Sequence, residues 1–194
     1  LPLASTERIG VVLAPGHAMC CFLSMMLKTQ QAPSPALWAA FIVACAGSLA
    51  LDLWTKQWAW ETLRPPDAAV VVWDPVLELS FAYNRGSAFG VVRELDSPTL
   101  VAVITTLLIG WVVFTAWRLG GGRLALAGAG MIVGGALGNL YDRLFRVDEL
   151  GQHGVVDFIR VNFPWGGSWP NFNVADAVLV VGLLLLLWSL RGRR

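Results

Sequence analysis

The chain has 194 residues, of which 56% are hydrophobic and only 14% are charged, and its formal net charge is +1. A soluble domain of this length carries about 25% charged residues. With ten Trp and two His, this composition excludes a disordered chain, a nucleic-acid-binding protein and an ordinary soluble enzyme. Cys20, Cys21 and Cys45 have no metal-binding or redox spacing, so we expect no disulfide framework, metal or cofactor. The composition predicts an integral membrane protein.

Residues 1–35 form an N-terminal extension to which we assign no function. The stretch 11–26 is apolar, but Pro15 and Gly16 interrupt it, and no small-residue cleavage site stands out. We interpret the extension as upstream sequence read from a start codon placed too early, with Met25 or Met26 as the true start. A weak additional helix is the alternative.

Residues 36–194 are predicted to form a membrane-embedded domain with four spanning helices. A bilayer core requires about 20 apolar residues in a helix. The spans are expected at about 36–54, 97–117, 124–142 and 173–190. The last segment is free of charge only from residue 177, so a full span must begin near Asn173 and bring Asp176 to membrane depth. An ionisable residue is costly there and indicates function.

The distribution of Lys and Arg predicts the orientation of the spans. The short segment 118–123 and the tail after the last span contain basic residues and no acid. The longer segments 55–98 and 142–173 contain more acids than basic residues. Cytoplasmic loops are enriched in Lys and Arg, so both termini should be cytoplasmic and both long segments external.

The first external segment is predicted to form a small β-sheet. Apolar and small or polar residues alternate over 77–83, and the run 70–73 is rich in β-branched residues. Asp74 and Pro75 break the chain between the two runs. The fold class is therefore an all-α integral membrane protein, with four transmembrane helices and a small extracytoplasmic β-rich segment.

Polar residues at the ends of the spans form five clusters, and the predicted topology puts all five on the external side. They are Asp52 with Lys56; Asn84; Asn139 with Asp142 and Arg143; Asp157; and Asn173 with Asp176. Three clusters also have structural interpretations: an ion pair for the first, a helix C-terminus for the third and a helix N-cap for the last. Asp157 is the hardest to explain structurally, because its neighbours are Val and Phe.

Four further carboxylates are interpreted as solvated loop charges: Glu78, Glu94, Asp148 and Glu149. Three glycines, Gly130, Gly134 and Gly138, recur at intervals of four residues, and this pattern predicts close helix packing.

Carboxylates from different elements, without a His or Cys partner, point to an aspartic-type hydrolase. One carboxylate accepts a proton from water while the other, protonated, donates to the scissile carbonyl. Two such groups held close together share a proton and titrate as a unit. A small proton- or ion-coupled transporter and a structural membrane subunit are the alternatives. A transporter would place its carboxylates near the bilayer midplane in repeated halves, a pattern that this chain lacks.

Five sequence blocks resemble, in order, the signature blocks of the bacterial lipoprotein signal peptidases (signal peptidase II). They are DLWTK at 52–56, NRGSAF at 84–89, GGALGNLYDR at 134–143, VVDF at 155–158 and FNVAD at 172–176. The resemblance covers about residues 36–190. It implies an intramembrane aspartic peptidase that removes the signal peptide of a prolipoprotein, cleaving before a lipobox Cys that carries a diacylglyceryl group.

Transferred to this chain, the resemblance makes Asp157 and Asp176 the catalytic pair. It makes eight residues site-shaping: Asp52, Lys56, Asn84, Gly86, Asn139, Asp142, Arg143 and Asn173. Asp142 is the rival for the second catalytic acid, and the resemblance favours Asp157. The segment 144–154 is longer than expected for the family.

The resemblance also implies partners and a location. The partners are lipid-modified prolipoproteins and membrane lipid, with no nucleic acid, and we expect a monomer. The location is the bacterial cytoplasmic (inner) membrane, with the active site at its extracytoplasmic face.

Overall fold

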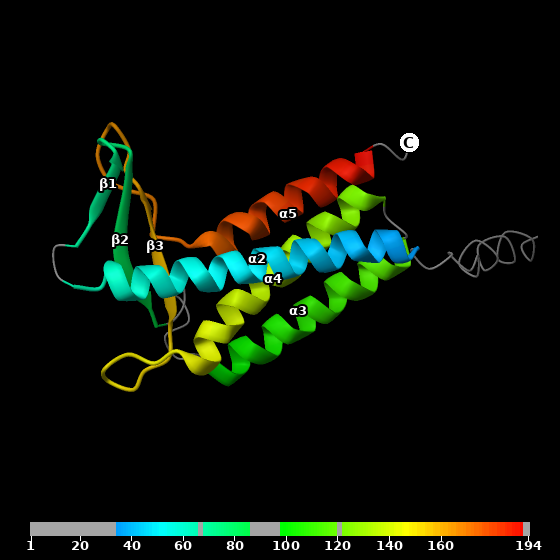
Figure 1. Cartoon of the computed structure of the whole chain (residues 1–194), viewed down its shortest axis with the longest axis horizontal. Coiled ribbons are helices and arrows are strands. Elements are labelled where there is room, and N and C mark those ends of the chain that lie inside the picture. The colour runs from blue at the N-terminus through cyan, green and yellow to red at the C-terminus, as the bar shows by residue number, and fades with distance from the viewer. Residues whose placement is uncertain (1–33, 66–67, 86–97, 120–121, 192–194) are drawn as a thin grey trace, which may run out of the picture. The chain divides into compact units, whose positions relative to one another are not determined.

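The computed structural model describes residues 34–65, 68–85, 98–119 and 122–191. These residues form four helices and a three-stranded sheet (Figure 1). The predictions for residues 1–33, Gly86 and Glu94 fall outside the described residues. The elements are α2 (Pro35–Thr62), β1 (Val70–Trp73), β2 (Leu77–Asn84), α3 (Pro98–Leu119), α4 (Arg123–Phe145), β3 (Val155–Val161) and α5 (Val174–Arg191).

Helix α4 is central, because it packs against α2, α3 and α5. Its three regularly spaced glycines all face α2. A Cβ atom added at Gly130 or Gly134 would press on the backbone carbonyl of Phe41 or Cys45, and one at Gly138 would press on the Asp52 carboxylate. The predicted close helix packing is therefore present, and it brings the polar end of α4 against the polar end of α2.

Two of the described helices, α2 and α4, are long and apolar enough to cross a membrane. The apolar stretches of the other two, Leu100–Ala116 in α3 and Val174–Ser189 in α5, are shorter. The fold is thus mostly helical with a small sheet, as predicted, while the number of spans stays a prediction.

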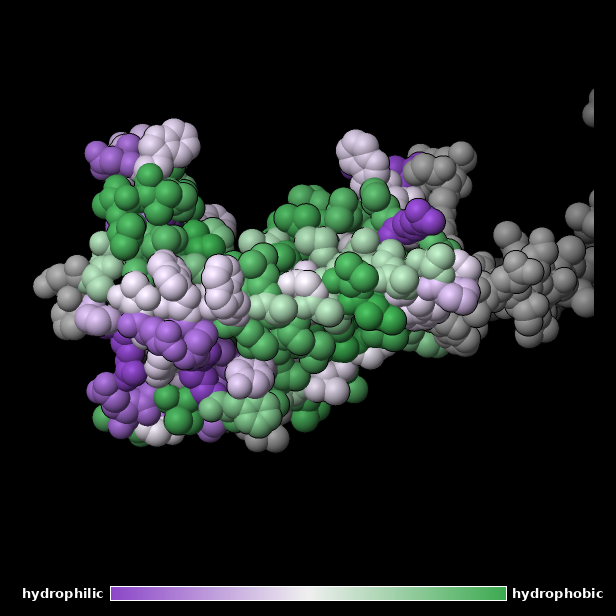
Figure 2. All heavy atoms as spheres, in the orientation of Figure 1, coloured by the Kyte–Doolittle hydropathy of each residue, from purple (hydrophilic) through white to green (hydrophobic). Residues whose placement is uncertain are grey.

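The helices expose apolar side chains over most of their length, as Figure 2 shows. On α3, Leu107 is 68% exposed and Trp111 is 64% exposed. An apolar surface of this extent is unusual for a protein surrounded by water. It fits a helix bundle whose outer faces contact lipid.

The sheet has the strand order β1-β2-β3, and both pairings are antiparallel. The predicted runs 70–73 and 77–83 correspond to β1 and β2, and the Asp74–Pro75 break lies between them. The third strand was not predicted. Residues of β2 are all partly buried, so the alternation in sequence does not become an alternation between buried and exposed positions.

Helix α2 is longer than its predicted span and ends at Thr62 instead of near residue 54. Its last two turns pack against the sheet, where Ala59 and Leu63 contact Val156 and Phe158 in a buried apolar cluster. Because β3 carries Asp157 between those two residues, this packing fixes the position of that carboxylate.

Candidate active site

Buried polar side chains gather where α2, α4, β3 and α5 meet the sheet. Polar groups are rarely buried unless they are paired, so a cluster of them in an apolar fold is informative. The described residues include six buried polar or charged side chains, and all but Ser48 belong to the predicted clusters: Asp52, Lys56, Asp142, Asp157 and Asn173.

Lys56 connects the polar groups of α2 and α4. Its side chain has no exposure to solvent, and its Nζ lies 2.7 Å from Asp52 Oδ2. The same Nζ donates to Asn139 Oδ1 at 2.7 Å and lies 3.8 Å from Asp142 Oδ2. The buried ammonium therefore contacts Asp52, Asn139 and Asp142. A buried charge needs such ionic and hydrogen-bonding partners to compensate for the loss of water.

The two carboxylates beside Lys56 hold the backbone of neighbouring elements. Asp52 Oδ1 accepts the N–H of Ala175 at 2.8 Å, in the first turn of α5. Asp142 Oδ2 accepts the N–H of Val156 at 3.1 Å, in β3. Asp142 Oδ1 accepts a hydrogen bond from Arg146 Nε at 2.9 Å. Both carboxylates thus act structurally, and they fix the elements that carry Asp157 and Asp176.

The start of α5 forms a reciprocal cap. Asn173 Oδ1 accepts the N–H of Asp176 at 3.1 Å, and Asp176 Oδ2 accepts the N–H of Asn173 at 3.2 Å. This arrangement satisfies backbone donors that the first turn of a helix leaves unpaired. The predicted N-cap is confirmed. The cap also fixes the Asp176 carboxylate, whose Oδ1 accepts Asn139 Nδ2 at 2.9 Å.

Asp157 is held by two side-chain amides. Asn173 Nδ2 donates to its Oδ1 at 2.7 Å, and Asn84 Nδ2 donates to its Oδ2 at 3.2 Å. Burial raises the pKa of Asp157 to about 6, and the negative charge of Asp176 acts in the same direction, while the two amides and Lys56 oppose the rise.

Asp157 and Asp176 are connected through one residue. The side chain of Asn173 donates to Asp157, and its backbone N–H donates to Asp176. Asn139 supports both acids, because it donates to Asp176 and accepts from Asn173 Nδ2 at 3.1 Å. The arrangement holds the two carboxylates on either side of Asn173, within electrostatic range of each other.

The structure brings together nearly all of the predicted site residues that it describes. Arg143, in the last turns of α4, is partly buried and within electrostatic range of Asp176, Asp157 and Asp142. Asp142, the rival catalytic acid, is fully buried and has both oxygens engaged. Among the residues that the structure describes, no three His, Cys, Asp or Glu side chains are grouped to hold a metal ion.

Three features near the site were not predicted from the amino-acid sequence. Arg146 binds Asp142 one helical turn away, a relation that the spacing of i and i+4 could have indicated. Strand β3 is a run of β-branched residues around Asp157, and this run was a usable signal. Asp148 was interpreted as a solvated charge, but its side chain is only 10% exposed and pairs with Arg85.

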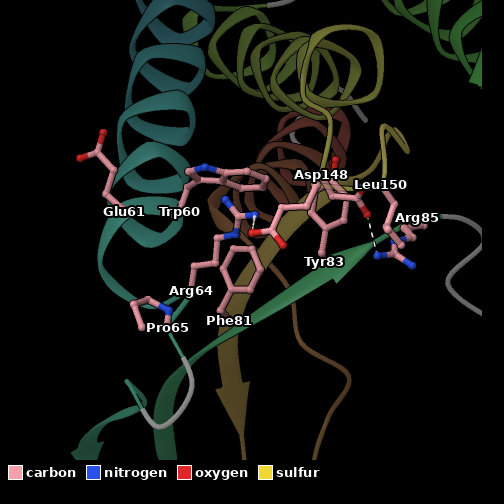
Figure 3. Close-up of a pocket in the computed structure, with 10 residues that line it drawn as sticks. Trp60, Glu61, Arg64, Pro65, Phe81, Tyr83, Arg85, Asp148 and Leu150 are labelled. Carbon is pink, nitrogen blue, oxygen red and sulfur yellow. Dashed lines mark hydrogen bonds and ion pairs between the residues drawn. The ribbon is translucent and has the colours of Figure 1, made fainter.

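A pocket of about 840 Å³ lies apart from these acids, between the end of α2, strand β2 and the loop after α4. Trp60, Phe81 and Tyr83 form its aromatic wall (Figure 3). The guanidinium of Arg64 lies over the ring of Trp60 at 4.4 Å and pairs with Glu149.

The fold and the buried acids define a class of protein, a helical membrane protein with a carboxylate site at one end of its bundle. Comparison with known proteins supports a narrower assignment. The model of the signal peptidase (SPase) II family matches residues 44–191. A lipoprotein signal peptidase of Chlorobium phaeobacteroides is 34% identical over 160 residues, which are 76% of this chain and 94% of that protein.

Another relative and a solved structure support the same family assignment. A lipoprotein signal peptidase of Aquifex aeolicus is 42% identical over 141 residues, which are 71% of this chain and 77% of that protein. A bacterial membrane enzyme solved by the in meso method at 2.3 Å resolution is 26% identical, with a TM-score of 0.65 over 79% of this chain and 88% of that chain. The chain therefore belongs to the signal peptidase II family, and the predicted resemblance is confirmed.

Proposed function

We propose that this chain is a membrane aspartic endopeptidase. It removes the signal peptide from diacylglyceryl-modified prolipoproteins by cleaving the peptide bond before the lipidated Cys. The observation that carries the proposal is the pair Asp157 and Asp176, which Asn173 connects by a hydrogen bond to each. Membership of the signal peptidase II family supports the substrate class.

The pair performs the reaction by transferring protons to and from the attacking water and the substrate. The ionised carboxylate takes a proton from a water molecule as that water attacks the scissile carbonyl carbon, and the protonated carboxyl donates its proton to the carbonyl oxygen. The tetrahedral intermediate collapses as the C–N bond breaks. The carboxyl that took the proton of the water gives it to the leaving nitrogen, and the other, now ionised, takes the proton of one hydroxyl group as the C=O bond re-forms. The raised pKa of Asp157, near 6, supports a pair that holds one proton.

The surroundings of the pair suit a lipid-anchored substrate. The signal helix and the acyl chains lie in the membrane beside the apolar outer faces of the helices. The scissile bond then reaches the carboxylates at the end of the bundle where the sheet lies (Figure 1). Asn84 and Arg143 contact the substrate backbone or its lipid carbonyls in this proposal.

The proposed setting is the bacterial cytoplasmic membrane, with four spans, both termini in the cytoplasm and the active site at the extracytoplasmic face. The chain acts there as a monomer on lipid-modified prolipoproteins. The transporter alternative receives less support, because the acids gather where α5 begins and where α4 approaches its end, and not midway along the helices.

Cleavage of a diacylglyceryl-modified model prolipoprotein by the purified protein in detergent tests the proposal. Asp157→Asn and Asp176→Asn should each lower the rate by about 10²–10⁴-fold, the usual effect of removing a catalytic acid or base. Asp74→Asn is the matched control, because Asp74 is an exposed loop carboxylate, and this variant should cleave normally.

Two outcomes would contradict the proposal. Full activity in a folded Asp157→Asn protein would remove Asp157 from the pair. Absence of cleavage by the parent protein, with lipidation of the substrate verified, would reject the peptidase and favour an assay of proton flux.

A further inference from the structure

The loop after α4 contacts the end of β2, on the side of the strand that faces the aromatic pocket. The Tyr83 hydroxyl shares its one proton between the backbone oxygens of Arg146 and Gln152, at 3.0 and 3.2 Å. These contacts join β2 to the segment 146–153, which lies within the stretch that is longer than expected for the family. Figure 3 shows Tyr83 and Arg85 beside this loop.

Asp148 organises the loop from within. Its Oδ1 accepts the backbone N–H groups of Leu150 and Gln152, each at 2.9 Å. The backbone closes the same turn, because Gly151 N–H donates to Asp148 O at 3.0 Å while Gly151 has a φ of 71°. The hydrogen bonds from Gln152 and Leu150 and the nearby Arg85 lower the pKa of Asp148, so its carboxylate stays ionised.

The second oxygen of Asp148 reaches β2. Its Oδ2 lies 2.6 Å from Nη2 of Arg85, the residue directly after Asn84. Successive side chains of an extended chain point to opposite sides. Asn84 can therefore donate to Asp157 on one side while Arg85 holds the loop on the other.

We propose that Asp148 is a positioning residue of the peptidase, which holds Arg85 and thereby keeps the end of β2 where Asn84 can bind Asp157. The inference rests on the proposed function, since it concerns the same catalytic pair. Tyr83 contributes to the same attachment through the shared hydrogen bond of its hydroxyl to the loop.

The proposal has a consequence for pH dependence. The charged groups that act on Asp157 are Asp176 from α5, Lys56 from α2 and Arg143 from α4, and within the described part of the chain none of them pairs with Asp148. The neutral donors Asn84 and Asn173 stabilise ionised Asp157. Loosening Asn84 alone should therefore raise the pKa of Asp157 and move the limb of the pH–rate profile near pH 6, which reports the ionisation of Asp157, to higher pH.

The test uses the purified full chain and the diacylglyceryl-modified model prolipoprotein. In Asp148→Asn, the side-chain oxygen still accepts the two backbone N–H groups, so the turn is kept while the charge facing Arg85 is lost. We expect about a fivefold lower kcat/KM at the pH optimum, of the order that breaking one partly exposed ion pair produces. The limb near pH 6 should shift upward, in the direction given by Asn84→Ala but by less.

Further variants test whether the effect is specific to the pair of Asp148 and Arg85. Arg85→Gln should reproduce the effect, and the double variant should be no worse than either single one, because both changes break one interaction. Glu149→Gln is the control. Glu149 follows Asp148 in the same loop, is 84% exposed and pairs with Arg64 instead of β2, so activity and pH profile should not change.

A limb near pH 6 that does not move in Asp148→Asn would overturn the positioning role, as would additive losses in the double variant. An equal effect of Glu149→Gln would overturn it too, because any loosening of the loop would then suffice. Absence of cleavage by the parent protein is a separate result, which rejects the proposed function itself.

Discussion

Lys56 shows how single residues hold this site together. It has no exposed side-chain atoms and lies between two buried carboxylates, while Arg146 binds the second of them. Lys56 and Arg146 thus supply two positive charges against the two negative charges of Asp52 and Asp142. Removing one partner of such a set leaves a buried charge uncompensated, which is far more costly than breaking a surface pair.

Lys56→Met should therefore unfold at a markedly lower temperature. We expect a loss of about 3–5 kcal/mol in the free energy of unfolding, because Asp52 loses its ammonium partner and Asn139 loses a donor. Thermal unfolding in detergent measures the change. Glu61→Gln is the matched control in the exposed last turn of α2 and should stay within about 0.5 kcal/mol. Equal melting temperatures for both variants would contradict the assignment.

Asp157 should lower the stability of the protein at neutral pH. Its pKa is about 6 in the folded chain and about 3.9 in an unfolded one. A carboxyl whose pKa is raised by folding binds more protons in the native state, so stability falls as pH rises from 4 to 6 and stays reduced above pH 6. The difference corresponds to a maximum of about 3 kcal/mol.

Asp157→Asn should consequently unfold at a higher temperature than the parent at pH 7 and at a similar temperature at pH 4, while losing activity. Unfolding curves at the two pH values give the comparison. The control is Asp74→Asn, whose exposed carboxylate should leave the pH dependence unchanged. A constant difference at both pH values would indicate a packing effect instead.

At the scale of elements, the positions of the two proposed catalytic acids, Asp157 and Asp176, depend on a contact made by the backbone of the residue before each. The α5 start is fixed by Asp52, which accepts the N–H of Ala175, and β3 is fixed by Asp142, which accepts the N–H of Val156. Helix α4 also touches α5 through glycine, since a Cβ at Gly135 would lie 2.7 Å from the Ala175 oxygen.

Gly135→Ala should push α5 away from α4 at the turn that carries Asp176. We expect about 1–3 kcal/mol of destabilisation from overpacking, together with lower peptidase activity. Gly110→Ala in α3 is the matched control, because no atom of the described residues crowds the position that a Cβ would take there, and alanine is a better helix former. That variant should be as stable as the parent or slightly more stable. Unfolding temperatures and cleavage rates of the two variants give the comparison, and similar values would contradict the packing argument.

At the scale of the whole molecule, Figure 2 shows hydrophilic side chains gathered on one side of the end that carries the sheet, while the helices between the two ends present mostly apolar side chains. The sheet lies at one end of the helices, where α4 ends and α5 begins, and the end of α3 and the start of α4 lie at the other (Figure 1). The basic residues around that turn and after α5 predict that this second end is cytoplasmic.

Cysteine labelling in intact cells tests this topology. In a background whose three native cysteines are replaced by alanine, Leu150→Cys should react with a membrane-impermeant maleimide from outside, because Leu150 is 72% exposed in the loop near the site. Arg123→Cys, at the start of α4, should react only after the membrane is permeabilised. Labelling of Arg123→Cys in intact cells would contradict the predicted orientation.

Much of this molecule could be predicted from the order of its residues. The apolar composition determined the membrane class, the runs at 70–73 and 77–83 indicated two strands, and the five polar blocks indicated the family. These features are local, since periodicity and motif spacing depend on neighbours along the chain. Asn173 and Asp176 belong with them, because three residues separate the two partners of the cap.

Only the tertiary structure decided what each polar residue contacts. Lys56 and Asn139 are 83 positions apart, and Asp52 and Ala175 are 123 apart, so no local pattern relates them. The structural role of Asp142, the connection of both catalytic candidates through Asn173 and the pairing of Asp148 with Arg85 likewise depend on how separate elements pack. A buried polar group is stabilised by whichever partner the fold brings within hydrogen-bonding distance, and burial is a property of the packed chain.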